Sequence, residues 1–239
     1  MIVAFIILWE ALVRTLQIPD YLVPGVWQVA RVFFEDAATL FSQTAYTFVE
    51  WIVGVCLSIL IGVAVALACF RWRRVRDTFG PILIVSQSVP YLAFAPLLLI
   101  WLGLGMTPKI VLVVLSCAFP VALALDEGLQ KSRAEFHVVV SMMKLKWSRA
   151  LRHVYFPAAM PQLFTGLKIS ASYAFVSTVM AELIGSESGL GIYLTRAQAS
   201  YRTDRVVAAV VVIVVISIMT TYVVDQVKLR VVFWDSVRK

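Results

Sequence analysis

Runs of mostly apolar residues, each about as long as a bilayer-crossing helix, recur along this chain and restrict its fold more than any other feature. They cover residues 1–17, 48–70, 81–104, 110–125, 162–184 and 206–224. A helix of about 20 apolar residues crosses the roughly 30 Å hydrocarbon core, where backbone polar groups must be satisfied within the segment. The last run is rich in Val and Ile, but 19 residues without charge are too long for a strand. We therefore expect about six transmembrane helices.

The amino-acid composition supports this class of protein. Of the 239 residues, 61% are apolar and 15% are charged, against about 45–50% and about 25% in soluble domains. A single globular core of this length needs a charged coat, and too few polar residues remain to make one. No repeat or linker divides the sequence. The expected fold class is an all-α integral membrane protein, with residues 1–239 forming one transmembrane domain.

Basic residues are distributed unevenly among the segments that join the apolar runs. Fourteen lie in segments 71–78 and 126–161 and in the tail: Arg71, Arg73, Arg74, Arg76, Lys131, Arg133, Lys144, Lys146, Arg149, Arg152, Lys228, Arg230, Arg238 and Lys239. Five lie in the alternate segments: Arg31, Lys109, Arg196, Arg202 and Arg205. Because Lys and Arg accumulate in cytoplasmic loops, we expect both termini and segment 126–161 in the cytoplasm. The net charge of +7 then reports orientation, and no nucleic-acid partner is expected.

Three smaller features refine this outline. Residues 1–17 lack a basic start and a small-residue cleavage site, so they are interpreted as a helix rather than a cleaved signal. Residues 26–34 have the pattern of a short interfacial helix, with Trp27 as its aromatic anchor. The cysteines Cys56, Cys69 and Cys117 lie inside apolar runs, which predicts small buried apolar residues.

The motifs of common catalytic and nucleotide-binding sites are absent from the sequence. It has two histidines, His137 and His153, in neither a zinc-binding nor a Cys/His pattern, so no metal site is expected. It has no phosphate-binding loop and no nucleophile elbow. The glycines Gly185, Gly189 and Gly191 have the wrong spacing for a dinucleotide site and are interpreted as a turn. We therefore expect no enzymatic activity.

Neutral polar residues gather in the third and fifth apolar runs. They are Ser86, Gln87, Ser88 and Tyr91 in the third run and Ser172, Tyr173 and Ser177 in the fifth. Such groups can line an aqueous pathway without the cost of a buried charge, and they can equally join helices or bond to their own backbone. Pro90 and Pro96 interrupt helical hydrogen bonding in the third run, which is tolerated where backbone lines a cavity.

Three ionisable residues lie in or near the apolar runs and are candidate functional residues for that reason: Glu10, Lys168 and Glu182. Lys168 can extend its amine to the cytoplasmic headgroups or serve transport. Glu182, near the outer end of the fifth run, can be solvated there or belong to the mouth of a pore. We include Glu182 with the seven polar residues above as candidate pathway residues.

The polar segment 126–161 has apolar residues at helical spacing and a basic face. A helix of this kind can lie on anionic lipid or dock into another protein. The stretch from Trp147 to Ser170 (WSRALRHVYFPAAMPQLFTGLKIS) resembles the coupling region and following helix of binding-protein-dependent ABC importer permeases. The motif of that family runs E-A-A, three residues, Gly, nine residues, an aliphatic residue, one residue, Leu and Pro.

Anchored on Pro157, the chain matches the end of this motif, with Val154 and Phe156 at the aliphatic and Leu positions. At its start, residues 138–140 are Val in place of E-A-A, and Lys144 stands in place of Gly. Further motifs resemble the nitrate, sulfonate, taurine and thiamine-precursor branch: Gln87 to Pro90, Ala95 to Leu98, Trp101 to Gly105, Phe119-Pro120, Ala181-Glu182 and Gly189 to Gly191.

The resemblance implies a type I importer permease in the bacterial cytoplasmic (inner) membrane. Two permease copies, expected to be identical, would form the pathway, an extracytoplasmic binding protein would deliver the solute, and the coupling segment would dock on ABC ATPase subunits. ATP and Mg would bind to those ATPase subunits, with no cofactor in this chain. The implied coupling residues are Val138, Val139, Val140, Lys144, Trp147, Arg149 and Pro157.

The segment from Leu194 to Asp204 resembles permeases for the pyrimidine precursor of thiamine or for riboflavin more than those for sulfonates. With neutral rather than basic residues in the third and fifth runs, this favours a heterocyclic vitamin or vitamin precursor as cargo. Sulfonate, taurine or nitrate remains an alternative, because helix N-termini also bind anions. A stand-alone secondary transporter and a membrane enzyme are two further alternatives, although each should carry membrane-embedded carboxylates or a His cluster.

Overall fold

The structure, a computed structural model, describes residues 2–86, 88 and 90–234. Within these ranges every regular element is a helix, as the sequence predicts, so the all-α class is confirmed. The elements are α1 (Ile2–Thr15), α2 (Val26–Glu35), α3 (Ala37–Arg71), α4 (Arg73–Ser86), the 3₁₀ turn η1 (Tyr91–Phe94), α5 (Ala95–Leu102), α6 (Met106–Met142), α7 (Trp147–Ala150), the π turn η2 (Leu151–Tyr155), α8 (Phe156–Glu182), α9 (Leu190–Ala199) and α10 (Thr203–Val231).

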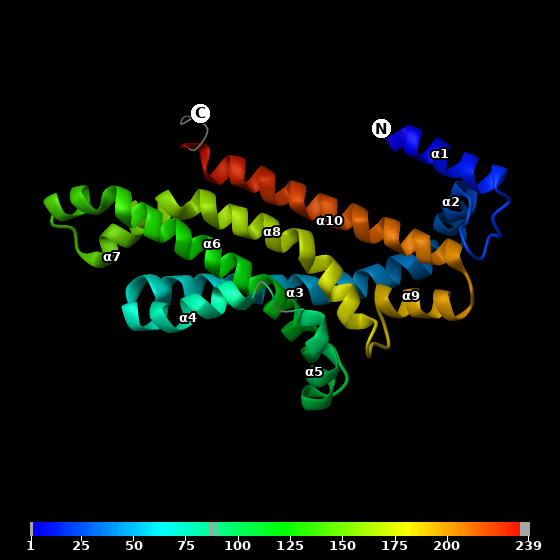
Figure 1. Cartoon of the computed structure of the whole chain (residues 1–239), viewed down its shortest axis with the longest axis horizontal. Helices are drawn as coiled ribbons and strands as arrows, with labels where there is room; N and C mark the ends of the chain where they lie inside the picture. Colours follow the sequence, from blue (N-terminus) through cyan, green and yellow to red (C-terminus); the bar gives the residue numbers. More distant parts are fainter. Residues whose placement is uncertain (1, 87, 89, 235–239) are drawn as a thin grey trace.

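Four long apolar helices form the body of the molecule. They are α3, α6, α8 with the two turns before it, and α10, and each is long and apolar enough to cross a membrane. They run along the long axis (Figure 1) and pack as the pairs α3 with α6, α6 with α8, and α8 with α10. Helices that are apolar on all faces are stable in this arrangement only where lipid surrounds the bundle.

Glycines let α6 approach its neighbours closely. A Cβ atom at Gly166 of α8 would lie 2.7 Å from Ala124 Cβ of α6, and one at Gly62 of α3 would lie 2.8 Å from the carbonyl oxygen of Ala118. Close backbone approach at small residues is the usual way in which membrane helices gain van der Waals contact, since lipid removes the hydrophobic drive between them. The α6 helix is therefore the centre of the bundle.

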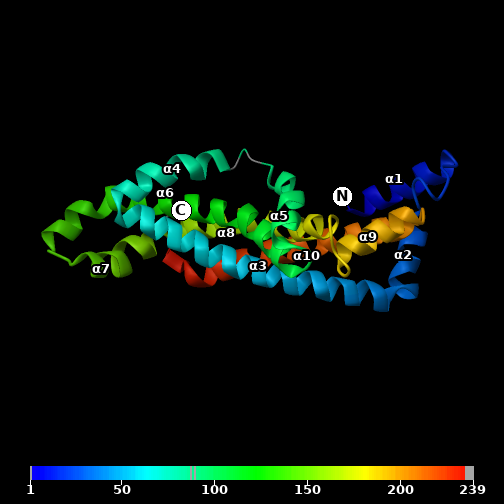
Figure 2. The same ribbon diagram turned by 90° about the horizontal axis from the view of Figure 1, so that it is seen from below.

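The predicted third span differs from expectation. Segment 71–78 was expected as a loop, but α3 ends at Arg71 and α4 begins at Arg73, and Pro81 lies inside α4. The directions of α4 and the η1–α5 segment differ by 99°, so they form one bent span or a re-entrant pair (Figure 2). Pro90 causes part of this break, because it cannot donate to a helical hydrogen bond and disfavours helical geometry in the residue before it. Counting the bent pair as one span gives up to five spans in the described residues.

The first predicted span, residues 1–17, is shorter in the structure than a membrane-crossing helix. The helix α1 has 14 residues, which at 1.5 Å each extend about 21 Å and do not reach across a core of about 30 Å. The predicted short helix at residues 26–34 is confirmed as α2, with Trp27 68% exposed, and its place at the membrane interface stays a prediction. Cys69 and Cys117 are buried as expected, whereas the prediction for Cys56 is wrong, because its side chain lies exposed on α3.

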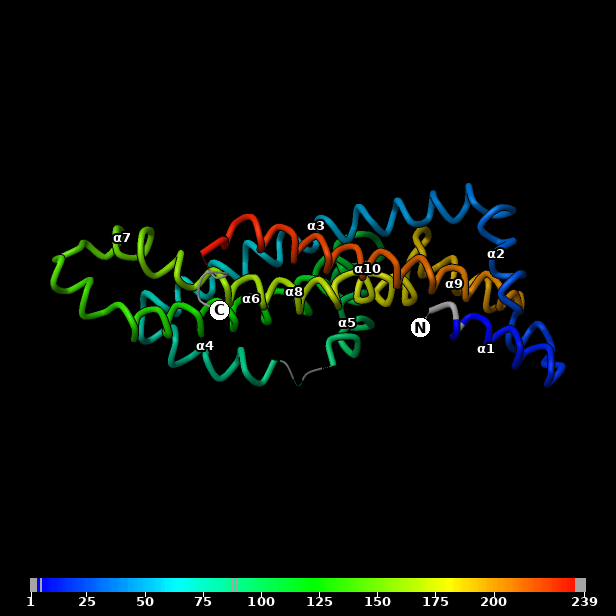
Figure 3. The backbone as a smooth tube through the Cα atoms, turned by 90° about the horizontal axis from the view of Figure 1, so that it is seen from above, coloured from blue at the N-terminus to red at the C-terminus, as the bar shows by residue number. Residues whose placement is uncertain are grey.

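Segment 126–161 is helical over most of its length, as its apolar spacing predicts. The α6 helix continues to Met142, and only Met143 to Lys146 separate it from α7. The extensions of α6 and α8 bury Leu129 of one against Ala159 of the other, which stabilises them outside the apolar run. This α6–α7 hairpin lies at one end of the molecule, here called the hairpin end, while α1, α2 and α9 lie at the opposite end (Figure 3).

The three basic segments gather at the hairpin end. The α3–α4 turn, the α6–α7 hairpin and the last turns of α10 all lie there (Figure 1). Arg238 and Lys239, which the sequence analysis counted in the tail, lie outside the described residues. The sequence-based grouping of these segments on one side is therefore reproduced by the packing of the helices.

Candidate functional site

A cavity of about 590 Å³ lies along adjacent faces of α6 and α8, beside η1. Its lining consists of Tyr91, Ser116, Pro120, Leu123, Ala124, Glu127, Thr165, Ile169, Tyr173 and Ser177. The four residues from α8 are spaced four apart, so one stripe of that helix faces the cavity. Of the predicted pathway residues, Tyr91, Tyr173 and Ser177 are brought together here, from segments far apart in the sequence.

The other predicted pathway residues lie elsewhere. Ser86 is buried, and its hydroxyl donates to the carbonyl oxygen of Leu83 at 2.7 Å. Ser88 is exposed, and Gln87 lies outside the described residues. The Ser172 hydroxyl donates to the carbonyl of Lys168, one turn earlier in α8. Bonding to local backbone, one of the two interpretations left open by the sequence, therefore applies to Ser86 and Ser172.

The cavity offers aromatic and hydroxyl groups and little charge. The ring of Tyr91 stacks on Phe119, with centroids 6.3 Å apart and an interplanar angle of 11°. Glu127 is the single charged residue among the described residues of the lining, which includes no Lys or Arg. Such a surface can stack a flat ring and form hydrogen bonds to it. It provides no positive side chain for an anion.

The predicted coupling segment forms the hairpin tip. Lys144 adopts a φ of +49°, in the left-handed region. Its N–H donates to the carbonyl of Ser141, and the N–H of Leu145 donates to that of Val140, which closes the end of α6. Left-handed residues at helix ends are usually glycine. The chain therefore keeps the backbone turn at the position where the resembled motif has glycine.

Exposed apolar side chains flank this turn. Val138 and Val139 are 62% and 50% exposed, whereas Val140 is half-buried against the core of the hairpin end. Trp147 is also exposed, and the guanidinium of Arg71 lies 5.0 Å from its ring centroid. A patch of this kind, with no cover in the described chain, has the character of a docking surface for a protein partner.

The remaining two predicted coupling residues lie on the path into α8. Arg149 is exposed on α7. Pro157 lies in the first turn of α8, directly after the π turn η2. Because proline has no N–H for the carbonyl four residues earlier, the wider turn before it accommodates the missing hydrogen bond.

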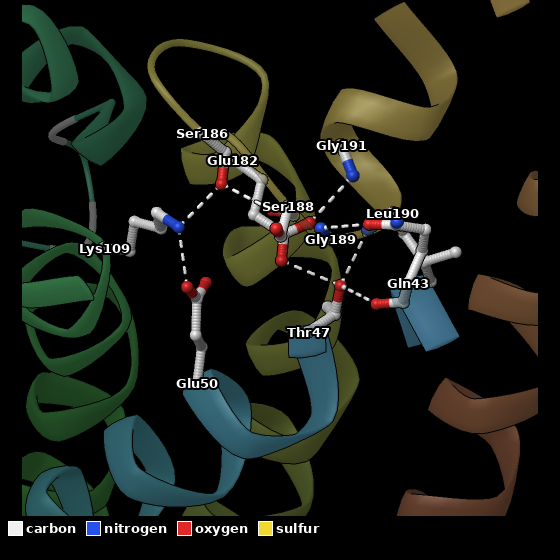
Figure 4. A network of polar contacts seen from close by, with 10 residues as sticks. All are labelled: Gln43, Thr47, Glu50, Lys109, Glu182, Ser186, Ser188, Gly189, Leu190 and Gly191. Atoms are coloured by element: carbon white, nitrogen blue, oxygen red, sulfur yellow. Dashed lines mark hydrogen bonds and ion pairs between the residues drawn. The ribbon is translucent and has the colours of Figure 1, made fainter. Parts of the chain in front are cut away.

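A buried polar network at the opposite end joins α3, α6 and the loop after α8 (Figure 4). Lys109 Nζ lies 2.6 Å from Glu50 Oε1 and donates to Ser186 Oγ at 2.6 Å. Lys109, expected in an outer loop, lies in the first turn of α6, and its pairing with Glu50 was not predicted from the sequence. Opposite charges at the same ends of two neighbouring apolar runs are the signal that could have identified it.

Glu182 belongs to the same network and does not line the cavity. It is 1% exposed, so the alternative of a solvated carboxylate is wrong. Thr47 Oγ1 donates to Glu182 Oε1, and the Gly191 N–H donates to Oε2, both at 2.7 Å. Gly189 has a φ of +110°, and a Cβ atom there would lie 2.1 Å from Glu182 Oε1. The predicted glycine turn is therefore confirmed, and it folds closely around the carboxylate.

Lys168 is partnered within the protein. Its Nζ lies 2.6 Å from Asp225 Oδ2 of α10, and both side chains are partly exposed. The structure shows that α10 supplies an anionic partner for this amine, and its extension to the headgroups stays a prediction. This pair joins α8 to α10 near the hairpin end.

Comparisons with known proteins agree with this geometry. Residues 58–232 match the family described as "Binding-protein-dependent transport system inner membrane component". A Haemophilus influenzae protein named as a probable ABC transporter permease protein is 33% identical over 92% of this chain and 90% of its own. The formylaminopyrimidine transport permease protein ThiX of Halalkalibacterium halodurans is 25% identical over 89% and 85%. The taurine transport system permease protein TauC of Escherichia coli is 29% identical over 83% and 72%.

A solved structure shares the fold. The crystal structure of an amino acid ABC transporter with histidines superposes with a TM-score of 0.69, covering 83% of this chain and 96% of the matched chain. At 14% sequence identity, this likeness concerns the fold alone.

Proposed function

Because the chain belongs to the family of binding-protein-dependent transport system inner membrane components, we propose that it forms the membrane pathway of an ATP-driven importer for a small heterocyclic solute. The chain is an ABC importer permease subunit. Membership of this family favours a transport subunit over the stand-alone secondary transporter and the membrane enzyme. The finer parts of the proposal are the cargo, the partner subunits and the orientation in the membrane.

The cavity between α6 and α8 carries the proposal for the pathway. A pathway in a pair of permeases needs a polar, water-accessible stripe on each copy, and exposed Thr165 and Tyr173 with half-buried Ser177 supply one here. A second copy of the chain, placed over this face, would enclose the cavity. The hairpin end, with its gathered basic residues, is then cytoplasmic in the bacterial inner membrane.

The hairpin tip supports the proposal for the ATPase. Exposed Val138, Val139 and Trp147 form an apolar surface next to basic residues, which suits a groove in a soluble subunit. ATP and Mg would bind to that subunit, so ATP hydrolysis would act on this chain through movement of its hairpin. An extracytoplasmic binding protein would deliver the solute to the opposite end.

The chemistry of the cavity favours a flat, neutral or weakly cationic heterocycle, such as a pyrimidine precursor of thiamine or riboflavin. Tyr91 and Tyr173 offer ring faces, and the one charged lining residue is acidic. A sulfonate, taurine or nitrate permease would be expected to offer a positive group on this surface. Anions of this kind remain the second candidate, because a taurine transport permease is among the relatives.

Cargo is tested by calorimetry on the cognate binding protein with a formylaminopyrimidine, riboflavin, taurine and nitrate. We expect tight binding of one of the two heterocycles and no heat with the anions. Tight binding of taurine, with no binding of either heterocycle, would contradict the proposed cargo but not the assignment as a permease.

Coupling is tested by co-purification with the ATPase and by solute-stimulated ATP hydrolysis. Arg149→Glu at the hairpin should weaken assembly more than about tenfold, since a reversed charge at an interface costs more than 1.4 kcal/mol. Lys131→Glu, an exposed basic residue of α6 outside the hairpin tip, is the matched control and should assemble normally. Deletion of residues 138–151 should abolish both readouts, and retention of both would contradict the coupling role.

A further inference from the structure

A second cavity, of about 550 Å³, opens at the hairpin end between the α3–α4 turn and α6. Four arginines line it: Arg71, Arg73 and Arg76 from the turn, and Arg133 from α6. Asp77 is the single acidic residue of the described lining. The cavity therefore concentrates positive charge, and it is separate from the cavity proposed for transport.

Aromatic rings, rather than carboxylates, hold two of these guanidiniums. Arg71 lies over Trp147 at 5.0 Å, and Arg133 lies over Phe70 at 5.8 Å. In the described part of the chain, no ion pair within 4.0 Å involves either residue. Stacking orients a planar guanidinium and leaves its N–H groups and its charge available. These two arginines are therefore oriented cations that no neighbouring acid neutralises.

The other two arginines have weak acidic partners. Arg76 Nε lies 3.9 Å from Asp126 Oδ2, and Arg73 Nε lies 4.0 Å from Asp77 Oδ2. Both distances exceed that of a charge-assisted hydrogen bond, which is about 2.7–2.9 Å. With these acids included, the four guanidiniums still leave an excess of positive charge around the cavity.

The ends of the apolar runs give this cavity an expected depth in the lipid headgroup layer. The apolar run of α3 ends at Phe70, and that of α6 ends at Leu125. Gln130 and Arg133 follow Leu125 by five and eight residues, or about 8–12 Å at 1.5 Å per residue, which places them in the headgroup layer. Trp72 beside the cavity is 56% exposed, as interfacial tryptophans are.

We propose that this cavity binds the phosphate of an anionic phospholipid from the cytoplasmic leaflet. The stacked guanidiniums of Arg71 and Arg133 would hold the phosphate oxygens through paired N–H groups. Basic pockets between membrane helices on the cytoplasmic side are suited to such headgroups. The proposal rests on the membrane orientation given above and not on the cargo.

The test measures lipid binding to the purified whole chain in detergent by native mass spectrometry, with phosphatidylglycerol, cardiolipin and phosphatidylcholine as probes. We expect both anionic lipids to bind and phosphatidylcholine to bind much more weakly. Because each of these substitutions removes charge-assisted hydrogen bonds to the phosphate, the double variant Arg71→Gln/Arg133→Gln should weaken anionic lipid binding more than about tenfold. Arg74→Gln removes the same charge from the same turn without lining the cavity and should change little.

Other outcomes would overturn the proposal. An equal loss of anionic lipid binding in Arg74→Gln would indicate non-specific attraction to the basic surface rather than a defined binding site. Binding of inorganic phosphate that displaces the lipid at millimolar concentration would indicate a site for the free ion. Unchanged lipid binding in the double variant, with loss of ATPase assembly, would indicate a protein surface. The variant Arg133→Lys, which keeps the charge without the paired N–H groups, should bind anionic lipid with intermediate affinity. Lipid binding is measured without cargo or ATPase, so failure of this proposal is distinct from failure of the proposed function.

Discussion

Lys109 Nζ of α6 lies 2.6 Å from Glu50 Oε1 of α3, with both side chains less than 10% exposed. The lysine also donates to Ser186 in the loop after α8, so one ammonium group joins three segments of the chain. Glu50 Oε2 has no hydrogen-bond partner among the described residues. The pair therefore fixes the end of the bundle opposite the hairpin at the cost of two buried charges.

Replacing only one residue of this ion pair should lower the stability of the protein more than replacing both. Lys109→Met leaves the Glu50 carboxylate buried without a counter-ion, which typically costs about 3–5 kcal/mol. The double variant Lys109→Met/Glu50→Gln removes both charges and should recover much of that stability. The measurement is thermal unfolding of the purified chain in detergent. A single variant as stable as the unmodified protein would show that the pair contributes nothing.

Lys144→Gly should stabilise the hairpin. Lys144 has a φ of +49°, and a left-handed conformation costs a non-glycine residue roughly 1–2 kcal/mol. Glycine avoids this strain, but its greater loss of chain entropy on folding cancels about half of the gain. We expect a gain of about 0.5–1 kcal/mol, measured as a higher Tm of the isolated permease. Lys131→Gly is the control, because Lys131 is exposed inside α6, where glycine lowers helix stability. A lower Tm in Lys144→Gly would contradict this interpretation of the turn.

Tyr173→Ala should impair transport without harming the fold. Its ring lines the cavity and is 56% exposed, so its removal leaves no buried void. An aromatic pair contributes about 0.5–1.5 kcal/mol beyond its buried area, which corresponds to about 2–10-fold in the concentration of solute-loaded binding protein needed for half-maximal uptake. Uptake into proteoliposomes containing the complete importer is the measurement. Tyr222→Ala, equally exposed on α10, should transport normally, and an equal defect in both would place the effect outside the cavity.

Tyr193 should make the protein sensitive to alkali. Burial raises the pKa of its hydroxyl above the ordinary value, and so does the hydrogen bond that it donates to Asp36 Oδ2 at 2.8 Å. Since the unfolded chain releases this proton near pH 10 while the folded chain retains it, the contribution of Tyr193 is complete below pH 10 and declines as pH rises above it.

Tyr193→Phe removes this ionisation and tests the sign of the effect. Its stability should fall less steeply above pH 10 than that of the unmodified protein, while near pH 7 it loses the hydrogen bond, worth about 0.5–1.5 kcal/mol. Paired urea unfolding curves at pH 7, 10 and 11 measure the difference. Parallel declines of the two proteins above pH 10 would contradict the prediction.

The sequence predicted spans correctly where the lipid environment allows only a helix. In residues 48–70 and 206–224, the backbone groups of a long apolar run can only pair within a helix, and both runs lie inside single helices. Pro90 likewise indicated an interruption before its geometry was known. The prediction was less accurate for segment 126–161, because apolar spacing beyond the membrane does not reveal that α6 and α8 will cover each other's extensions.

The composition and order of residues by themselves determined the membrane class, the helical elements and the side on which basic segments gather, because these depend on transfer from water and on local hydrogen bonding. The tertiary structure alone decided that Glu50 meets Lys109, that Glu182 lies inside a glycine turn, and that Tyr91 shares a cavity with Tyr173. These contacts depend on the rotation and close approach of packed helices. A difference of one residue in helix rotation, about 100°, would separate each pair.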